Sequence, residues 1–95
     1  MVPSNRIPSH PGVILLEEFL EPMGIAQVQF AGKLGVTVQR INEIVKGKRG
    51  ITSQTAWLLA GALGTTPEFW MNLQTTYDLA RNRPDRKIPR LRSAR

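Results

Sequence analysis

The sequence predicts an all-α domain of five helices. Three observations support this fold class: apolar residues recur three and four positions apart, no segment alternates as a strand would, and glycine or proline follows each apolar stripe. A chain of 95 residues is long enough for one domain with one hydrophobic core. We expect that domain to span residues 9–82, with an N-terminal arm at 1–8 and a basic, mostly irregular tail at 83–95.

Each expected helix has its own start and stop signals. Ser9 or His10 can cap the first helix ahead of Pro11, which suits a first helical turn. Pro22 and Gly24 are expected to end it. The later helices have a threonine or serine before the first turn and a glycine near an end, at Thr37, Thr52 or Ser53, and Thr66, and at Gly35, Gly47 and Gly64. These signals predict helices at about 10–21, 26–34, 38–46, 53–63 and 67–81.

The net charge of +6 is concentrated at the C-terminal end. Residues 1–80 hold six basic and six acidic side chains, whereas residues 81–95 hold seven basic side chains and one acid. Within the neutral part, residues 33–49 carry five basic groups and one acid, and residues 17–21 carry three acids. A basic patch with a basic tail indicates a polyanionic partner. The alternative is a solvated tail that keeps the protein soluble.

The composition gives little support for catalysis or metal binding. The absence of cysteine and the presence of a single histidine exclude thiolate and multi-histidine metal sites. His10 stands beside Pro11 with no nucleophile or second base, so we interpret it as a helix-start residue. Glu17 and Glu18 are adjacent and do not share a helix face, so they form no acid/base pair. We expect no enzyme activity, no metal and no cofactor.

Nothing in the sequence indicates a membrane segment. No apolar run approaches the roughly 18 residues of a membrane span, and residues 1–11 lack the apolar centre of a signal peptide. We therefore expect a cytoplasmic, nucleoid-associated protein that does not contact a membrane.

Residues 26–47 carry the most informative pattern. Two short helices are separated by about three residues, with Gly35 first in the turn, where positive φ lets the chain reverse. Ala31 is small enough for the second helix to cross closely. The second helix would be anchored to the core by Val36, Ile41 and Ile44. Its outer face is polar except for Val38, which is typical of a DNA-recognition helix. An ordinary αα-hairpin within a helical bundle is the alternative.

This stretch resembles the helix-turn-helix of the phage-repressor-like (Xre/Cro) family, which implies a lambda-repressor-like fold. Further segments between residues 9 and 80 resemble the HigA/VapI antitoxins: His10-Pro11-Gly12, Phe19-Leu20-Glu21-Pro22, Arg40-Ile41-Asn42-Glu43-Ile44, Gly47-Lys48-Arg49-Gly50-Ile51 and Thr66-Pro67-Glu68-Phe69-Trp70-Met71-Asn72-Leu73-Gln74. The resemblance implies a homodimer that neutralises an mRNA-cleaving HigB-like toxin and represses its own operon. Ala26 departs from the serine or threonine cap common in the wider family, and the basic tail is not part of the motif.

Positions within the motif assign roles in DNA binding. The residues expected to face bases are Thr37, Val38, Gln39 and Asn42, where Gln39 and Asn42 offer both donor and acceptor to adenine. The residues expected to contact phosphates are Arg40, Lys46, Lys48 and Arg49, and Gln27 matches the family position that hydrogen-bonds the DNA backbone. Phosphates would repel Glu43 unless it pairs with Arg40, Lys46 or a cytosine amine.

The last expected helix offers a dimer surface. A domain of this size cannot easily bury Trp57, Trp70, Tyr77 and three phenylalanines on one side. An aromatic stripe of this kind more often belongs to the core, and the hypothesis is that its outer part contributes to a two-fold interface that includes Phe69, Trp70, Met71, Leu73, Gln74 and Tyr77. Such a dimer would place two recognition helices roughly 34 Å apart on a palindromic operator of double-stranded DNA.

Three functions remain open at this point. The first is an antitoxin and autorepressor, the second a stand-alone transcriptional regulator without a toxin, and the third a helical protein-interaction module. Pro84 and Pro89 exclude a regular helix through the tail. Its basic residues are expected to add non-specific DNA affinity or to contact the toxin: Arg81, Arg83, Arg86, Lys87, Arg90 and Arg92.

Overall fold

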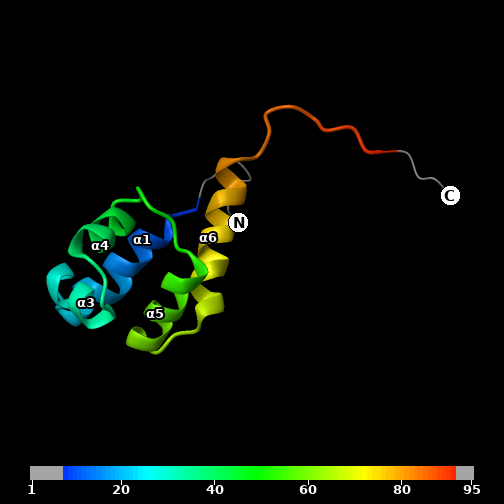
Figure 1. The fold of residues 1–95 in the computed structure, drawn as a ribbon. Coiled ribbons are helices and arrows are strands. Elements are labelled where there is room, and N and C mark those ends of the chain that lie inside the picture. The colour runs from blue at the N-terminus through cyan, green and yellow to red at the C-terminus, as the bar shows by residue number, and fades with distance from the viewer. Residues whose placement is uncertain (1–7, 92–95) are drawn as a thin grey trace.

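The computed structural model describes residues 8–91, and helices are the only regular elements in this part of the chain (Figure 1). The expected five-helix, all-α fold is confirmed. The expected N-terminal arm, apart from Pro8, and residues 92–95 of the expected tail, including Arg92, lie outside the described residues. Residues 83–91 leave the last helix and run away from the bundle with every side chain exposed (Figure 1). No helix in the described range is long and apolar enough to cross a membrane.

The first helix is continuous but not uniform. It consists of α1 (Pro11–Ile14), the π-helical turns η1 (Leu15–Leu20) and α2 (Glu21–Met23). Pro22 was expected to help end the helix, yet it lies inside the last turn, directly after the wider π-helical stretch. Gly24, with φ of 66°, ends the helix.

The remaining helices begin and end within one residue of the expected positions. They are α3 (Gln27–Leu34), α4 (Val38–Val45), α5 (Ser53–Leu63) and α6 (Pro67–Arg81). At the starts of α4, α5 and α6, a threonine hydroxyl accepts a hydrogen bond from the N–H three residues later, at Thr37, Thr52 and Thr66. Gly35 and Gly64 adopt positive φ values of 74° and 72° and end α3 and α5.

All five helices contribute to one hydrophobic core. Its fully or nearly buried members are Leu15, Leu20, Phe30, Ala31, Ile41, Ile44, Ile51, Ala56, Leu59 and Trp70. Trp70 lies at the centre with no exposed surface, and its Nε1–H donates to the Thr65 hydroxyl at 2.7 Å. Phe19 and Phe69 pack against its ring. Burial of this aromatic group joins the first helix to α6.

Two members of the expected dimer interface are interior residues, so the expectation is wrong for them. Trp70 is fully buried, and Gln74 is buried between α6 and the loop before α5. The Gln74 Oε1 accepts from the N–H of Ile51 at 2.6 Å, and its Nε2 donates to Asp78 at 2.9 Å. These two bonds hold the Gln74 side chain inside the domain.

The other four residues of that expected interface differ in exposure. Phe69 is 38% exposed, whereas Met71 and Leu73 are half-buried against the core. Tyr77 is half-buried, with its ring edge-to-face to His10 at 4.9 Å. The assignment of these four residues to a dimer interface stays a prediction.

His10 caps the first helix, as expected for a helix-start residue. Its Nδ1 accepts a hydrogen bond from the N–H of Gly12 at 2.9 Å. Burial lowers the pKa of His10, an effect that Asp78 opposes and Arg81 reinforces. The ring is therefore neutral near pH 7, which leaves Nδ1 free to accept.

Gly12 marks the closest approach between α1 and α4. A Cβ atom at this position would overlap the carbonyl oxygen of Ile44 and lie 2.6 Å from its carbonyl carbon. Both obstacles are backbone atoms of α4, so no side-chain rotation could relieve the clash. The absence of a side chain at Gly12 therefore lets α4 dock directly against the first helix.

We predict that Gly12→Ala lowers the free energy of unfolding by about 3 kcal/mol or more, because the methyl group must push α4 away from α1. Urea denaturation at one fixed protein concentration measures the change. Gly32→Ala is the matched control: an added Cβ there meets no described atom within 4 Å. The control should leave stability unchanged or raise it by up to about 1 kcal/mol. Equal stabilities for the two variants would contradict the proposed close contact.

Candidate nucleic-acid interface

The turn between α3 and α4 has the geometry that the sequence predicts. Gly35 reverses the chain, and the N–H of Val36 donates to the carbonyl of Ala31 at 3.0 Å. Ala31 is buried where the two helices meet. Ile41 and Ile44 hold the inner face of α4 in the core, as expected, while Val36 is only half-buried. This anchoring fixes which face of α4 points outward.

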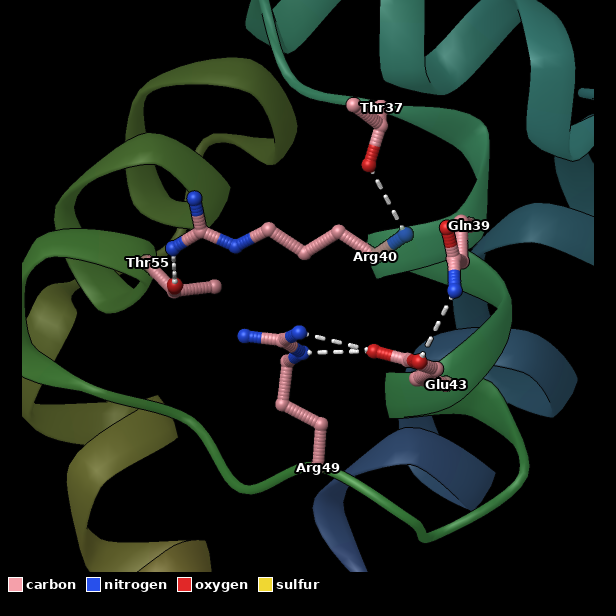
Figure 2. Close-up of polar contacts among 6 residues, drawn as sticks. All are labelled: Thr37, Gln39, Arg40, Glu43, Arg49 and Thr55. Carbon is pink, nitrogen blue, oxygen red and sulfur yellow. Dashed lines mark hydrogen bonds and ion pairs between the residues drawn. The ribbon is translucent and has the colours of Figure 1, made fainter.

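The first turn of α4 presents the residues that were expected to face bases. Thr37, Val38 and Gln39 are exposed, with Val38 at 44%. The Thr37 hydroxyl already accepts the N–H of Arg40 at 3.1 Å as the helix cap (Figure 2). Because this bond uses only one lone pair of the oxygen, the hydroxyl hydrogen of Thr37 remains available as a donor.

Asn42 is tied to the start of α3. Its Nδ2 donates to the Oε1 of Gln27 at 3.2 Å, and both side chains are half-buried. The sequence indicated both residues separately but gave no sign that they touch. The Oδ1 of Asn42 and the Nε2 of Gln27 take no part in this bond. The pair therefore links the first residue of α3 to the middle of the outward face of α4.

Glu43 is neutralised by a partner that sequence reasoning missed. Arg49 donates to its carboxylate from Nε at 2.9 Å and Nη2 at 2.8 Å, and Gln39 approaches from the other side at 3.4 Å (Figure 2). The expected partners were Arg40, Lys46 or a cytosine amine. Arg49 reaches Glu43 because the chain reverses at Gly47, whose φ is 75°, and the N–H groups of residues 48 and 49 bond the Glu43 carbonyl. This reversal places residue 49 beside residue 43.

Arg40, which was expected to contact phosphates, points toward α5 rather than outward. Its Nη2 donates to the buried hydroxyl of Thr55 at 2.7 Å (Figure 2). Its Nε is buried and has no hydrogen-bond partner among the described residues. The guanidinium thus joins the third residue of α4 to the first turn of α5. Thr55 itself was not predicted, because a threonine in an apolar stretch shows no signal in the sequence.

The remaining basic residues form a group at the C-terminal end of α4. Lys46 and Lys48 are exposed, and the Arg49 side chain is 50% exposed beside Glu43. Because Arg49 offsets the charge of Glu43, the two lysines give this end of α4 a net positive charge. The structure thus brings together the exposed residues at the start of α4 and a basic segment directly after its last turn.

A helix pair joined by a glycine turn, with the second helix held by a buried face and its polar face outward, defines a helix-turn-helix protein. A family model described as Helix-turn-helix matches residues 16–70. Virulence-associated protein I of Dichelobacter nodosus is 45% identical over 84 residues, which cover 87% of this chain and 78% of that protein. Antitoxin HigA-1 of Vibrio cholerae serotype O1 is 43% identical over 82 residues, covering 84% of this chain and 77% of that protein.

A solved structure is similar over nearly the whole chain. It is antitoxin GraA in complex with its operator, with a TM-score of 0.84 and 35% identity, covering 98% of this chain and 100% of that one. The chain therefore belongs to the helix-turn-helix family that includes the HigA antitoxins, as the resemblance in its sequence implied.

We predict that Thr55→Val lowers the free energy of unfolding by about 1–3 kcal/mol, because it leaves the buried end of Arg40 without an acceptor. The same change made in an Arg40→Met background should cost about 1 kcal/mol less, which a double-mutant cycle by urea denaturation measures. Thr75→Val, at an exposed position of α6, is the control and should be nearly neutral. Identical costs of Thr55→Val in both backgrounds would show that the contact between α4 and α5 does not stabilise the fold.

Proposed function

We propose that this protein is an antitoxin that binds the operator of its own operon through α3 and α4 and neutralises an mRNA-cleaving, HigB-like toxin. The observation that carries the DNA-binding part is the outward face of α4, which is polar, rigidly anchored and basic at one end. The relative GraA, solved with its operator, supports the same mode for this chain. The toxin-neutralising part rests on the HigA relatives.

Different residues on and near the outward face of α4 are suited to contact bases and phosphates. Val38 and Gln39 are exposed at the end of α4 that enters a major groove in helix-turn-helix proteins, and Asn42 lies one turn further on. We assign base contacts to these three residues and to the Thr37 hydroxyl. Lys46 and Lys48 are placed for phosphates, and Gln27 stands at the N-terminus of α3, which itself attracts an anion.

Two arginines have conditional roles in this proposal. Arg49 can contact a phosphate with the guanidinium edge that Glu43 leaves free. Arg40 can do so only through Nη1, because its Nη2 donates to Thr55 and its Nε is buried. We therefore expect Arg40 to contribute less to DNA affinity than Lys46 or Lys48.

The proposal includes the state and place of the protein. We propose a homodimer on a palindromic double-stranded operator, located in the cytoplasm with the nucleoid. We also propose that it has no enzymatic activity and needs no cofactor, since its relatives are named as antitoxins. Residues 9–82 form the DNA-binding domain, and the basic tail at 83–95 adds non-specific DNA affinity or a toxin contact.

We predict opposite signatures for two substitutions on α4 and the residues after it. Gln39→Ala should weaken operator binding by about 1–3 kcal/mol and relax selectivity at the base that Gln39 contacts. Lys48→Gln should weaken operator and shuffled DNA alike and reduce the slope of log affinity against log salt by about 1. Fluorescence anisotropy between about 50 and 200 mM salt measures both. A uniform loss from Gln39→Ala would mean that Gln39 does not read a base.

Co-expression with the product of the adjacent gene tests the antitoxin role. We expect this chain to co-purify with that product, to relieve its growth inhibition and to retard a DNA fragment from its own promoter. Retardation of the fragment without any toxin partner would support a stand-alone regulator instead. If the chain neither co-purifies with the toxin nor retards the DNA fragment, or if its DNA affinity does not change with salt, a protein-interaction module is supported.

A further inference from the structure

The outward face of α5 exposes a tryptophan. Trp57 is 68% exposed, whereas the second tryptophan, Trp70, is completely buried. The opposite face of α5 is buried in the core through Thr55, Ala56, Leu59 and Ala60. An exposed indole ring is a large apolar surface left in water, and such surfaces mark interaction sites when apolar neighbours surround them.

Two hollows flank Trp57. The first has a volume of about 310 Å³ and lies toward α3, lined by Lys33, Leu34, Trp57, Leu58, Gly61 and Ala62. The second has a volume of about 230 Å³ and lies toward α6, lined by Ser53, Trp57, Pro67, Glu68, Met71 and Asn72. A cavity of about 150 Å³ already accommodates benzene, so the first hollow has room for an indole ring. The face therefore carries both a protruding aromatic ring and a depression that could receive one.

Gly61 is an exposed glycine on α5. It lies inside α5, one turn after Trp57, and its φ is not positive. A Cβ built on it would meet no atom of the described residues within 4 Å. Glycine weakens a helix relative to alanine, so Gly61 adds no stability to α5 itself. A missing side chain at this point leaves space for a partner to approach the backbone of α5.

The charge pattern favours a second copy of this chain as that partner. Residues 53–63 contain no charged side chain, whereas the first helix (residues 11–23), α3, α4 and α6 each contain at least one. A two-fold axis brings each residue near it close to its own copy, so a charged residue there would face a like charge. For a chain of net charge +6, an uncharged helix is the favourable surface to place at the axis.

We propose that α5 is the homodimer interface, with the two α5 helices packed antiparallel and the Trp57 ring of each copy seated in the hollow beside Gly61 of the other. An axis that passes between the turns of Trp57 and Gly61 pairs each tryptophan with the glycine of the other copy. The proposal rests on the homodimer of the proposed function and locates its interface. It moves the interface from α6 to α5 and keeps Met71, which lines the second hollow.

Sedimentation of the full-length chain without DNA provides the test. The wild-type protein should sediment at twice the chain mass of 10.6 kDa. Trp57→Glu should raise the dimer dissociation constant at least about 30-fold, as expected for an aromatic residue at the centre of an interface. Leu79→Glu is the matched control, because Leu79 is 69% exposed on α6 and should leave the constant unchanged. A wild-type monomer at about 100 μM, or equal effects of the two variants, would overturn the proposal.

Two glycine variants test the interface independently of Trp57→Glu, in case that variant does not fold. Gly61→Gln should fold at least as well as the wild type and yet weaken the dimer, because its side chain fills the hollow. Gly32→Gln makes the same change at another open helical glycine, in α3, and should leave the dimer intact. Acrylamide quenching of wild-type fluorescence reports Trp57, since Trp70 is buried; dilution into the monomer range should increase quenching. No increase in quenching, or a Gly61→Gln dimer of wild-type strength, would contradict the interface.

Two further readouts separate this proposal from the proposed function. Trp57→Glu should retain wild-type affinity for a DNA fragment with a single half-site and lose affinity for the full palindrome. If the wild type dimerises through α5 but binds no operator DNA, the interface stands and the DNA-binding function fails. If Trp57→Glu releases the toxin while the dimer mass is unchanged, the α5 face belongs to the toxin and the proposal is overturned.

Discussion

The contact of Gly12 with the backbone of α4 determines where the recognition helix can sit. Without a side chain at residue 12, the first helix lies directly against the carbonyl group of Ile44. The His10 cap holds the start of that first helix, and Ile41 and Ile44 hold α4 from its own inner face. With α4 held on two sides by close-packed contacts, its outward face is fixed relative to the core.

The polar groups on and beside that outward face are held in place before any DNA arrives. Glu43 is paired with Arg49, Arg40 with Thr55, and Asn42 with Gln27. Side chains that are already ordered lose less conformational freedom on binding, so such pairs favour a preorganised surface. The pairing of Glu43 also removes the one negative charge that α4 would otherwise bring to the phosphates. The exposed end of this ordered surface, at Val38 and Gln39, is left for the DNA bases.

The sequence predicted the secondary structure well because its signals are local. Threonine caps, glycine stops and the spacing of apolar residues act within one helical turn, and Thr37, Gly35 and Gly64 behave as those rules require. Pro22 differs, since it is accommodated in the last turn of the first helix, and the π-helical turns over Leu15–Leu20 were not predicted. The helix-turn-helix followed from the same local rules together with the polar face of α4.

The contacts of the candidate site depended on residues far apart in the chain. Arg40 meets Thr55 and Gln27 meets Asn42 across fifteen positions, and no local pattern joins them. Periodicity also did not show which aromatic residues are buried: Trp70 and Trp57 both have apolar neighbours in the sequence, and only packing buries one and exposes the other. The exposed side of α5 could not be predicted, because a helix without charged residues shows no polar face in its sequence.

An amide NMR titration of the ¹⁵N-labelled protein with a duplex of its own promoter tests the central claim most directly. The claim is that a rigidly held α4 presents its outward face to DNA. We expect the largest shift changes at residues 37–43 and at the start of α3, with little change along residues 53–63. Large changes confined to α5 and α6, with residues 37–43 unaffected by the specific duplex, would contradict it.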